Sequence, residues 1–196
     1  KSLVAQVEEM AAAGVRTIVM EVSSPGGEAA HCFETGNEIR SLFDEYGIRS
    51  IGYADTLACS GGYALICVCD EVIANPDATL GSIGCVIALT DTSKAYEMAG
   101  LKRIFITSGA NKVPFDASGS FKKEFLDELQ EDVNNINETF AQHVSAHTGL
   151  DVDTIKGFQA GVFSGSVAVE KGLANKTMTT REFASYVAAI HKGKIQ

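Results

Sequence analysis

The stretch Asp55-Thr56-Leu57-Ala58-Cys59-Ser60-Gly61-Gly62-Tyr63 decides how the rest of the chain is organised. An apolar strand is predicted before it, over 49–54, and a helix or buried segment after it, over 63–69. The small residues between them form a tight turn that presents Ser60, and proteins mount serine nucleophiles on such turns, next to the N–H groups of a helix start. A glycine-rich turn in which Ser60 only caps the following helix explains the stretch equally well. The surrounding chain must decide between the two interpretations.

Segments predicted to be strands and helices alternate along the chain. Runs of β-branched and apolar residues predict strands over 16–22, 49–54, 72–74, 83–89 and 102–107. Apolar residues at three- and four-residue steps predict helices over 3–13, 29–46, 94–100, 120–147 and 180–190. This alternation is typical of an α/β fold with a mainly parallel sheet, helical crossovers and a long C-terminal helical region. We expect one domain over 1–196.

Two glycine turns follow predicted strands. Pro25-Gly26-Gly27 comes after the strand over 16–22, and Ser60-Gly61-Gly62 comes after the strand over 49–54. Parallel strands end at the same edge of a sheet, and ligands of such sheets usually bind at that edge. We therefore expect the two turns to meet there.

Composition excludes several classes of protein. The content of 45% hydrophobic and 21% charged residues is that of an ordinary globular protein. A net charge of −9 argues against a nucleic-acid-binding surface. No apolar run approaches the ~20 residues needed to cross a bilayer, and no signal peptide is present in this stretch. The chain opens inside an amphipathic pattern, so we expect it to be a fragment of a longer protein.

No metal or other cofactor is predicted. The five cysteines stand at irregular spacing on apolar segments, which indicates reduced, buried thiols in a reducing compartment. Cys67 and Cys69 would point to opposite faces of a strand, which does not suit a zinc site. His143 and His147 have the i, i+4 spacing of a zinc pair, but no glutamate base lies between them. Cys59 is an alternative nucleophile, although the two glycines that follow Ser60 favour the serine.

A serine nucleophile needs a base that takes its proton. Histidine is the usual base, and His31, one turn into the helix after Pro25-Gly26-Gly27, is the best placed of the four histidines. The alternative is Lys112, which follows the predicted strand over 102–107 and the turn Ser108-Gly109-Ala110-Asn111. A lysine on such a loop is most often a solvated surface charge. It can act as a base only as a neutral amine, which burial favours.

Five motifs of the chain resemble, in the same order, those of the signal peptide peptidase A (protease IV) family of serine proteases. That family lies within the Clp-protease/crotonase superfamily. The motifs are Ser24-Pro25-Gly26-Gly27, Ala58-Cys59-Ser60-Gly61-Gly62-Tyr63, Gly81-Ser82-Ile83-Gly84-Cys85-Val86, Ser108-Gly109-Ala110-Asn111-Lys112, and Phe163-Ser164-Gly165 with Ala168 and Gly172-Leu173-Ala174. The resemblance covers the chain from about residue 14 to residue 175, and it implies a Clp/crotonase-like fold.

The resemblance also implies a set of catalytic roles. Ser60 would be the nucleophile and Lys112 the general base of a Ser-Lys dyad, with Ser82 hydrogen-bonded to the lysine. Gly27 and Gly61 would supply the N–H groups of the oxyanion hole. The chain departs from the family around the base, where the family usually has an aromatic residue and a second lysine or an aspartate. It also lacks the family's strand before the first helix.

Two related mechanisms are less consistent with the sequence. A Clp-type triad needs a histidine soon after the nucleophile, and none occurs between Ser60 and His143. A crotonase-type acyl-CoA enzyme would have glutamates flanking its oxyanion hole, whereas none follows Ser60 before Glu71. We therefore expect a serine endopeptidase that hydrolyses peptide bonds through an acyl-enzyme.

The pattern without a membrane span is more similar to versions from phage head-assembly clusters than to membrane-anchored enzymes. This implies a protease that processes phage capsid or scaffold proteins, in the host cytoplasm or the procapsid. The alternatives are a bacterial peptidase that degrades signal peptides, membrane-associated through a missing N-terminal segment, and a non-catalytic assembly protein. Family members form rings, so we expect a homo-oligomer in which Lys112 could serve the Ser60 of a neighbour.

Overall fold

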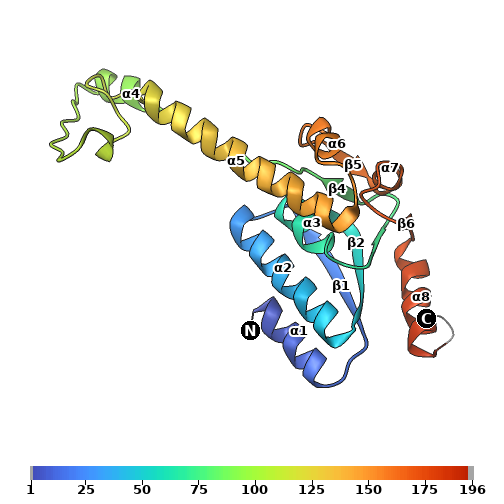
Figure 1. The fold of residues 1–196 in the computed structure, drawn as a ribbon. Coiled ribbons are helices and arrows are strands. Elements are labelled where there is room, and N and C mark those ends of the chain that lie inside the picture. The colour runs from blue at the N-terminus through green and yellow to red at the C-terminus, as the bar shows by residue number, and fades with distance from the viewer. Residues whose placement is uncertain (1, 194–196) are drawn as a thin grey trace. The chain divides into compact units, whose positions relative to one another are not determined.

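The computed structural model describes residues 2–193 of the chain (Figure 1). Its contacts divide the chain into two compact units. The first holds residues 1–84 and 137–196, and the second holds residues 85–136. The single domain expected over 1–196 stays a prediction, because two compact units can belong to one domain or to two.

The elements of the first unit alternate much as the sequence predicts. Up to residue 84 they are α1 (Leu3–Ala12), β1 (Thr17–Ser24), α2 (Ala29–Tyr46), β2 (Arg49–Cys59), α3 (Gly61–Ile66), β3 (Glu71–Ala74) and β4 (Thr79–Gly81). From residue 137 they are the second half of α5 (Lys123–Thr148), α6 (Val152–Gly157), β5 (Val162–Ser164), α7 (Gly165–Glu170), β6 (Lys176–Thr177) and α8 (Thr180–His191). The helix predicted over 29–46 is confirmed at both ends, whereas β2 runs five residues beyond its predicted end.

The strands form a mostly parallel sheet with β2 at its centre. The order is β5-β4-β2-β3-β6, and β1 pairs with β2 as well. Every pairing between these strands is parallel except that of β4 with β5. The predicted α/β fold with a mainly parallel sheet is confirmed. Because parallel strands point the same way, β1, β2 and β4 deliver the turns that follow them to one edge of the sheet.

The length of β2 lets one strand organise the site. Its first half pairs with β1 and with β3, and Leu57–Cys59 at its end pair with β4. The final register places Cys59 opposite Gly81. Ser60 and Ser82, each the next residue along the chain, therefore leave the sheet side by side.

Helices cover both faces of the sheet, as the alternation of residues along β2 requires. Gly52 and Ala54 face the larger core, where a Cβ on Gly52 would lie 2.5 Å from a side-chain carbon of Ile66. Ile51 and Tyr53 face the smaller core under α8, where the Tyr53 ring stacks on Phe183 with centroids 3.8 Å apart.

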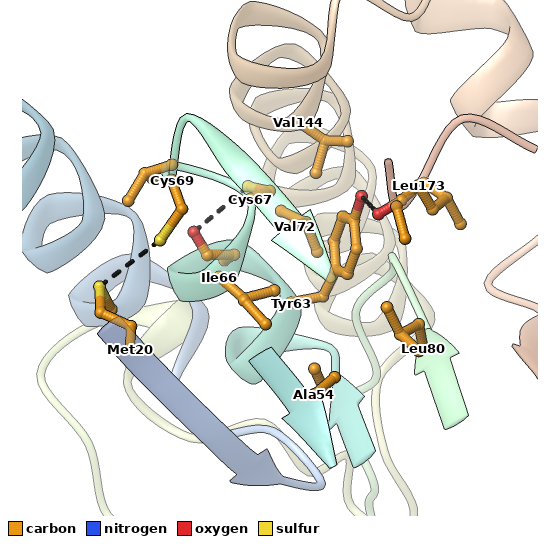
Figure 2. Close-up of a cluster of buried hydrophobic side chains, with 14 of the residues drawn as sticks. Met20, Ala54, Tyr63, Ile66, Cys67, Cys69, Val72, Leu80, Val144 and Leu173 are labelled. Carbon is orange, nitrogen blue, oxygen red and sulfur yellow. Dashed lines mark hydrogen bonds between the residues drawn. The ribbon is translucent and has the colours of Figure 1, made fainter. Parts of the chain in front are cut away.

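Helix α3 lies inside the larger core (Figure 2). Tyr63 is fully buried there, and its hydroxyl donates a 2.9 Å hydrogen bond to the carbonyl of Leu173. Cys67 and Cys69 lie in the turn after α3 rather than on a strand, and both are buried. All five cysteines are free thiols. Cys59 is buried like Cys67 and Cys69, whereas Cys32 and Cys85 are partly exposed.

The second unit departs most from the sequence predictions. It contains α4 (Ser93–Met98), the short 3-10 helix η1 (Ala110–Lys112) and the first half of α5. The strands predicted over 83–89 and 102–107 are wrong, because neither segment pairs with another strand. β-branched residues favour a strand only where a partner strand is available. Ile83 packs in the core, but several large apolar side chains of these segments are open to solvent, and Ile106 is 97% exposed.

Aromatic contacts hold the second unit together. The rings of Phe105, Phe115, Phe121 and Phe125 follow one another with centroid separations of 5.8, 4.9 and 6.0 Å. The Arg103 guanidinium lies 3.8 Å from the Tyr96 ring centroid. Across residues 2–193, no helix has the length and the apolar character that crossing a membrane requires.

Candidate active site

Ser60 occupies a strained turn between β2 and α3. Its φ and ψ are 51° and −123°, and its side chain makes no capping hydrogen bond. Its N–H donates to the Gly81 carbonyl at 2.8 Å, and its own carbonyl accepts from the N–H groups of Tyr63 and Ala64. A non-glycine residue with such angles costs about 1–3 kcal/mol and persists only where its surroundings hold it. Ser60 therefore stands at the N-cap position of α3 without a side-chain cap, and its strained turn is the kind that the nucleophile interpretation expects.

The Pro25-Gly26-Gly27 turn lies directly against Ser60, as expected for two turns at one sheet edge. A Cβ on Gly26 would lie 2.8 Å from the Ser60 Cβ and 3.2 Å from its Oγ. The φ of Gly26 is also +128°, which L side chains rarely adopt. Only glycine fits here, so Gly26 is required for the approach of the two turns. No role of its own was predicted for Gly26, although the Pro-Gly-Gly pattern marks it.

Two unpartnered backbone amides meet beside this serine. Within the described part of the chain, neither the N–H of Gly27 nor that of Gly61 has a hydrogen-bond acceptor. A Cβ built on Gly61 would lie only 3.1 Å from the Gly27 nitrogen. Gly61 is fully buried and is the first residue of α3. Gly27, by contrast, is exposed. Two free N–H donors close together can stabilise an oxyanion, because both can point at the atom on which the negative charge develops.

Cys32 supports this pair of amides from α2, and no local sequence signal points to it. Its Sγ would lie 2.6 Å from a Cβ on Gly61 and 3.9 Å from one on Gly27. Burial, together with the charge of Glu28, raises the pKa of its thiol. Cys32 is therefore a neutral side chain that fills the space next to Gly61.

Cys59 does not compete with Ser60 as a nucleophile. Its side chain is buried, and its Sγ donates to the Thr79 carbonyl at 3.5 Å. Burial raises the pKa of the Cys59 thiol. The reactive thiolate form is therefore suppressed at neutral pH.

Ser82 stands next to Ser60 on a second unusual turn. Its φ is 52°, and its N–H donates to the Gly161 carbonyl at 2.8 Å. That carbonyl belongs to a turn in which Gln159 and Ala160 also have positive φ. The 159–161 turn thus sets the direction in which Ser82 leaves β4, a contact that no motif in the sequence indicated.

Lys112 belongs to the second unit, whereas the other four predicted site residues belong to the first. It is the last residue of η1, its side chain is exposed, and its N–H donates to the Gly109 carbonyl at 3.2 Å. The strand that was expected to carry its loop to the sheet edge does not form. Its own unit does not bury it as a neutral amine base requires. Its role stays a prediction.

Three of the four histidines were candidates for a base or a metal site, and each occupies a different environment. His31 is exposed, and its Nδ1 lies 3.4 Å from the Glu28 Oε1. His143 is buried, with its Nε2 2.9 Å from the Ala64 carbonyl. The Nε2 of His147 lies 3.4 Å from the Asn37 Oδ1. Among residues 2–193, no group of three or more His, Cys, Asp and Glu side chains could hold a metal ion.

A serine on a strained turn beside two free amides, at the edge of a parallel sheet, is typical of enzymes that transfer acyl groups. A model of peptidase family S49 matches residues 43–193. The chain belongs to peptidase family S49, the family type that its motifs predicted.

Three relatives illustrate the range of the family. The chain is 28% identical over 181 residues to the head-tail preconnector protein GP5 of Enterobacteria phage P21, covering 92% of this chain and 36% of that protein. It is 28% identical over 165 residues to the capsid assembly protease C of Escherichia phage lambda, covering 84% and 37%. It also matches an SppA-named protein of Enterococcus faecium, 28% identical over 163 residues, covering 83% and 47%. The chain thus spans little more than a third of the two phage proteins.

Proposed function

We propose that this chain is the protease domain of a phage-type S49 peptidase that processes capsid or scaffold proteins. Ser60 is the nucleophile, Gly27 and Gly61 supply the oxyanion hole, Lys112 is the general base, and Ser82 orients the lysine. The observation that carries the proposal is the pair of unpartnered amides beside the strained Ser60 turn. The phage assignment is supported by the similarity to the lambda capsid assembly protease C.

In the proposed reaction, each of these residues has one task. The Ser60 Oγ attacks the peptide carbonyl while the neutral lysine takes its proton. The oxyanion then accepts hydrogen bonds from the two amides, each worth about 3–4 kcal/mol in such a site. The lysine returns the proton to the leaving amine, and an acyl-enzyme remains. The same lysine then activates a water molecule, which hydrolyses the acyl-enzyme. This step releases the carboxylate product and restores the Ser60 hydroxyl.

A lysine stays neutral only where water is excluded from it, and contacts between subunits can exclude water. Lys112 is exposed within its own unit. We therefore also propose that the protein works as a homo-oligomeric ring. In it, neighbouring subunits or the bound peptide exclude water from the lysine. Lys112 then serves Ser60 of its own chain or of a neighbour.

A fluorophosphonate probe, which phosphonylates activated serines, tests the proposal. The probe should label Ser60, identified by mass spectrometry of the tryptic peptide, and should compete with cleavage of a fluorogenic peptide library. Ser60→Ala should abolish both signals. Ser41→Ala is the matched control, because Ser41 lies on α2 and only donates to the Asn37 carbonyl. A folded wild-type protein that neither labels nor cleaves would favour the non-catalytic assembly protein instead.

A further inference from the structure

Helix α3 is too short to hold its own position. It has six residues, from Gly61 to Ile66, and isolated helices shorter than ~12 residues are marginal in water. Yet its first residue supplies a free amide, and Ser60 precedes it directly. The placement of the proposed nucleophile and of half the oxyanion hole must therefore come from tertiary contacts.

Two side chains anchor α3 through hydrogen bonds. Tyr63, on the helix itself, donates to the Leu173 carbonyl at 2.9 Å, and Figure 2 shows the ring directed at that atom. His143, from the part of α5 that belongs to the first unit, lies 2.9 Å from the Ala64 carbonyl through its Nε2. In the Tyr63 contact, a side chain of α3 binds a carbonyl outside the helix. In the His143 contact, a side chain from outside binds a backbone carbonyl of α3.

The His143 contact has a defined polarity. A carbonyl only accepts hydrogen bonds, so the His143 Nε2 must carry the proton. The ring is only 7% exposed and packs on Phe33, with centroids 5.3 Å apart. Helix α2 faces the ring with Gly36, where a Cβ would lie 3.3 Å from the His143 Cε1. The absence of a side chain at Gly36 leaves room for the imidazole. Burial lowers the pKa of His143, which keeps the ring neutral.

Little else satisfies the carbonyl that His143 binds. Carbonyls in the last turn of a helix have no helical partner, and α3 ends two residues after Ala64. The other hydrogen bond to this oxygen comes from the Cys67 thiol at 3.4 Å, and a thiol is a weak donor. The imidazole is therefore the main donor to a buried carbonyl in the helix that carries the amide of Gly61.

We propose that His143 is a positioning residue of this site: its Nε2–H holds α3 so that Ser60 and the Gly61 amide keep their places. The proposal rests on the proposed function, because it assigns His143 an effect on catalysis at Ser60. His143 does not touch the reacting atoms and transfers no proton.

The test compares two nearly isosteric replacements. His143→Gln keeps an N–H donor of similar reach, whereas His143→Met has similar length and no donor. A misplacement of about 1 Å can cost about 100-fold in rate. We therefore expect His143→Met to lower kcat and the rate of fluorophosphonate labelling of Ser60 by about 10–100-fold, with KM within about threefold. His143→Gln should retain both rates within about threefold. His147→Met, one turn further along α5, controls for loss of an imidazole and should keep the wild-type rates.

Amide hydrogen exchange of residues 60–66 measures how firmly the His143 hydrogen bond holds α3, and it does not depend on activity. Exchange should accelerate in His143→Met and stay at the wild-type rate in His143→Gln. Equal labelling and equal exchange in the two folded variants would overturn the proposal, as would a His143→Gln variant as slow as His143→Met. If His143→Met does not fold, the decision rests on His143→Gln, whose slower labelling or faster exchange overturns it. Failure of the proposed function would differ, since the wild-type protein would not label while the exchange pattern remained.

Discussion

The N–H of Ser60 donates a 2.8 Å hydrogen bond to the carbonyl of Gly81. This bond continues the pairing of β2 with β4 by one residue beyond the register of Cys59 with Gly81. It joins the turn that presents Ser60 to the turn that presents Ser82. Two serines separated by 21 intervening residues are thereby fixed at one sheet edge, and the following predictions depend on that arrangement.

A side chain at Gly61 should displace the amide of the proposed oxyanion hole, because it would clash with Cys32. A Cβ at this position would lie 2.6 Å from the Cys32 Sγ. Gly61→Ala should therefore lower kcat by about 100-fold, comparable to the loss of one oxyanion donor. Cys32→Ala removes the clashing atom, so the double variant should recover at least about tenfold of that loss. Steady-state kinetics of the four proteins measures the coupling, and strictly additive effects would contradict the arrangement of the two residues.

Lys112 should be irreplaceable by arginine. A guanidinium keeps its proton at any working pH, so Lys112→Arg cannot accept the Ser60 proton. We expect both Lys112→Arg and Lys112→Ala to lose about 10²–10⁴-fold in kcat. The wild-type rate should rise with pH and level off once the base is neutral. Retention of activity by Lys112→Arg, combined with loss in His31→Ala, would replace the dyad by a serine–histidine site.

Chelation should not affect hydrolysis. The Nε2 of His143 is engaged with the Ala64 carbonyl, and that of His147 lies by the Asn37 side chain. The pair is therefore not arranged to share a metal. Activity after dialysis against EDTA should stay within about twofold of the untreated protein, since no step of the proposed mechanism uses a Lewis acid. Loss of activity that zinc restores would reopen the histidine pair as a metal site.

Acid should destabilise the first unit through His147. Burial, with the nearby charge of Arg40, lowers the pKa of His147 to about 4, against 6.5 for the ordinary side chain. The unfolded chain therefore binds a proton at higher pH than the folded one. Stability from this group is complete above pH 6.5 and declines as the pH falls towards 4.

The size of this effect is at most about 3 kcal/mol, and less than that because the ring is partly exposed. Urea midpoints at pH 7.5, 5.5 and 4.5 measure it. His147→Gln cannot take up the proton, so its stability should fall less between pH 7.5 and 4.5. An identical decline in both proteins would assign the acid sensitivity to other groups.

Gly165 should be the glycine least tolerant of a side chain in the fold. A Cβ there would lie 2.0 Å from the Asn75 carbonyl oxygen, a backbone atom that cannot move aside cheaply. Gly165→Ala should therefore lower the free energy of unfolding by about 3–5 kcal/mol. Gly157→Ala is the matched control, because nothing lies within 4 Å of its Cβ position, and it should be neutral or slightly stabilising. Thermal denaturation compares the two, and a Gly165→Ala protein of wild-type stability would contradict this packing.

Local sequence patterns were sufficient for most of the first unit. The 3.6-residue periodicity of α2 and the β-branched run of β1 are properties of consecutive residues, and a buried face stabilises each. The Pro-Gly-Gly and Ser-Gly-Gly turns were also readable, because positive φ and close backbone approach require glycine. The same reasoning failed over 102–107, where a strand-like sequence has no partner strand in its unit.

The sequence by itself determined the α/β class, the S49 family motifs, and the meeting of Gly26 and Gly27 with Ser60 at one sheet edge. Only the tertiary structure decided that Ser60 adopts a strained conformation and that its side chain does not cap α3. Only it placed Cys32 under Gly61, Gly161 against Ser82 and His143 on the Ala64 carbonyl. The physical reason is that these contacts join residues far apart in the chain, and their partners are backbone atoms. A backbone carbonyl or amide is the same in every residue, so no side-chain pattern announces which one a distant side chain will bind.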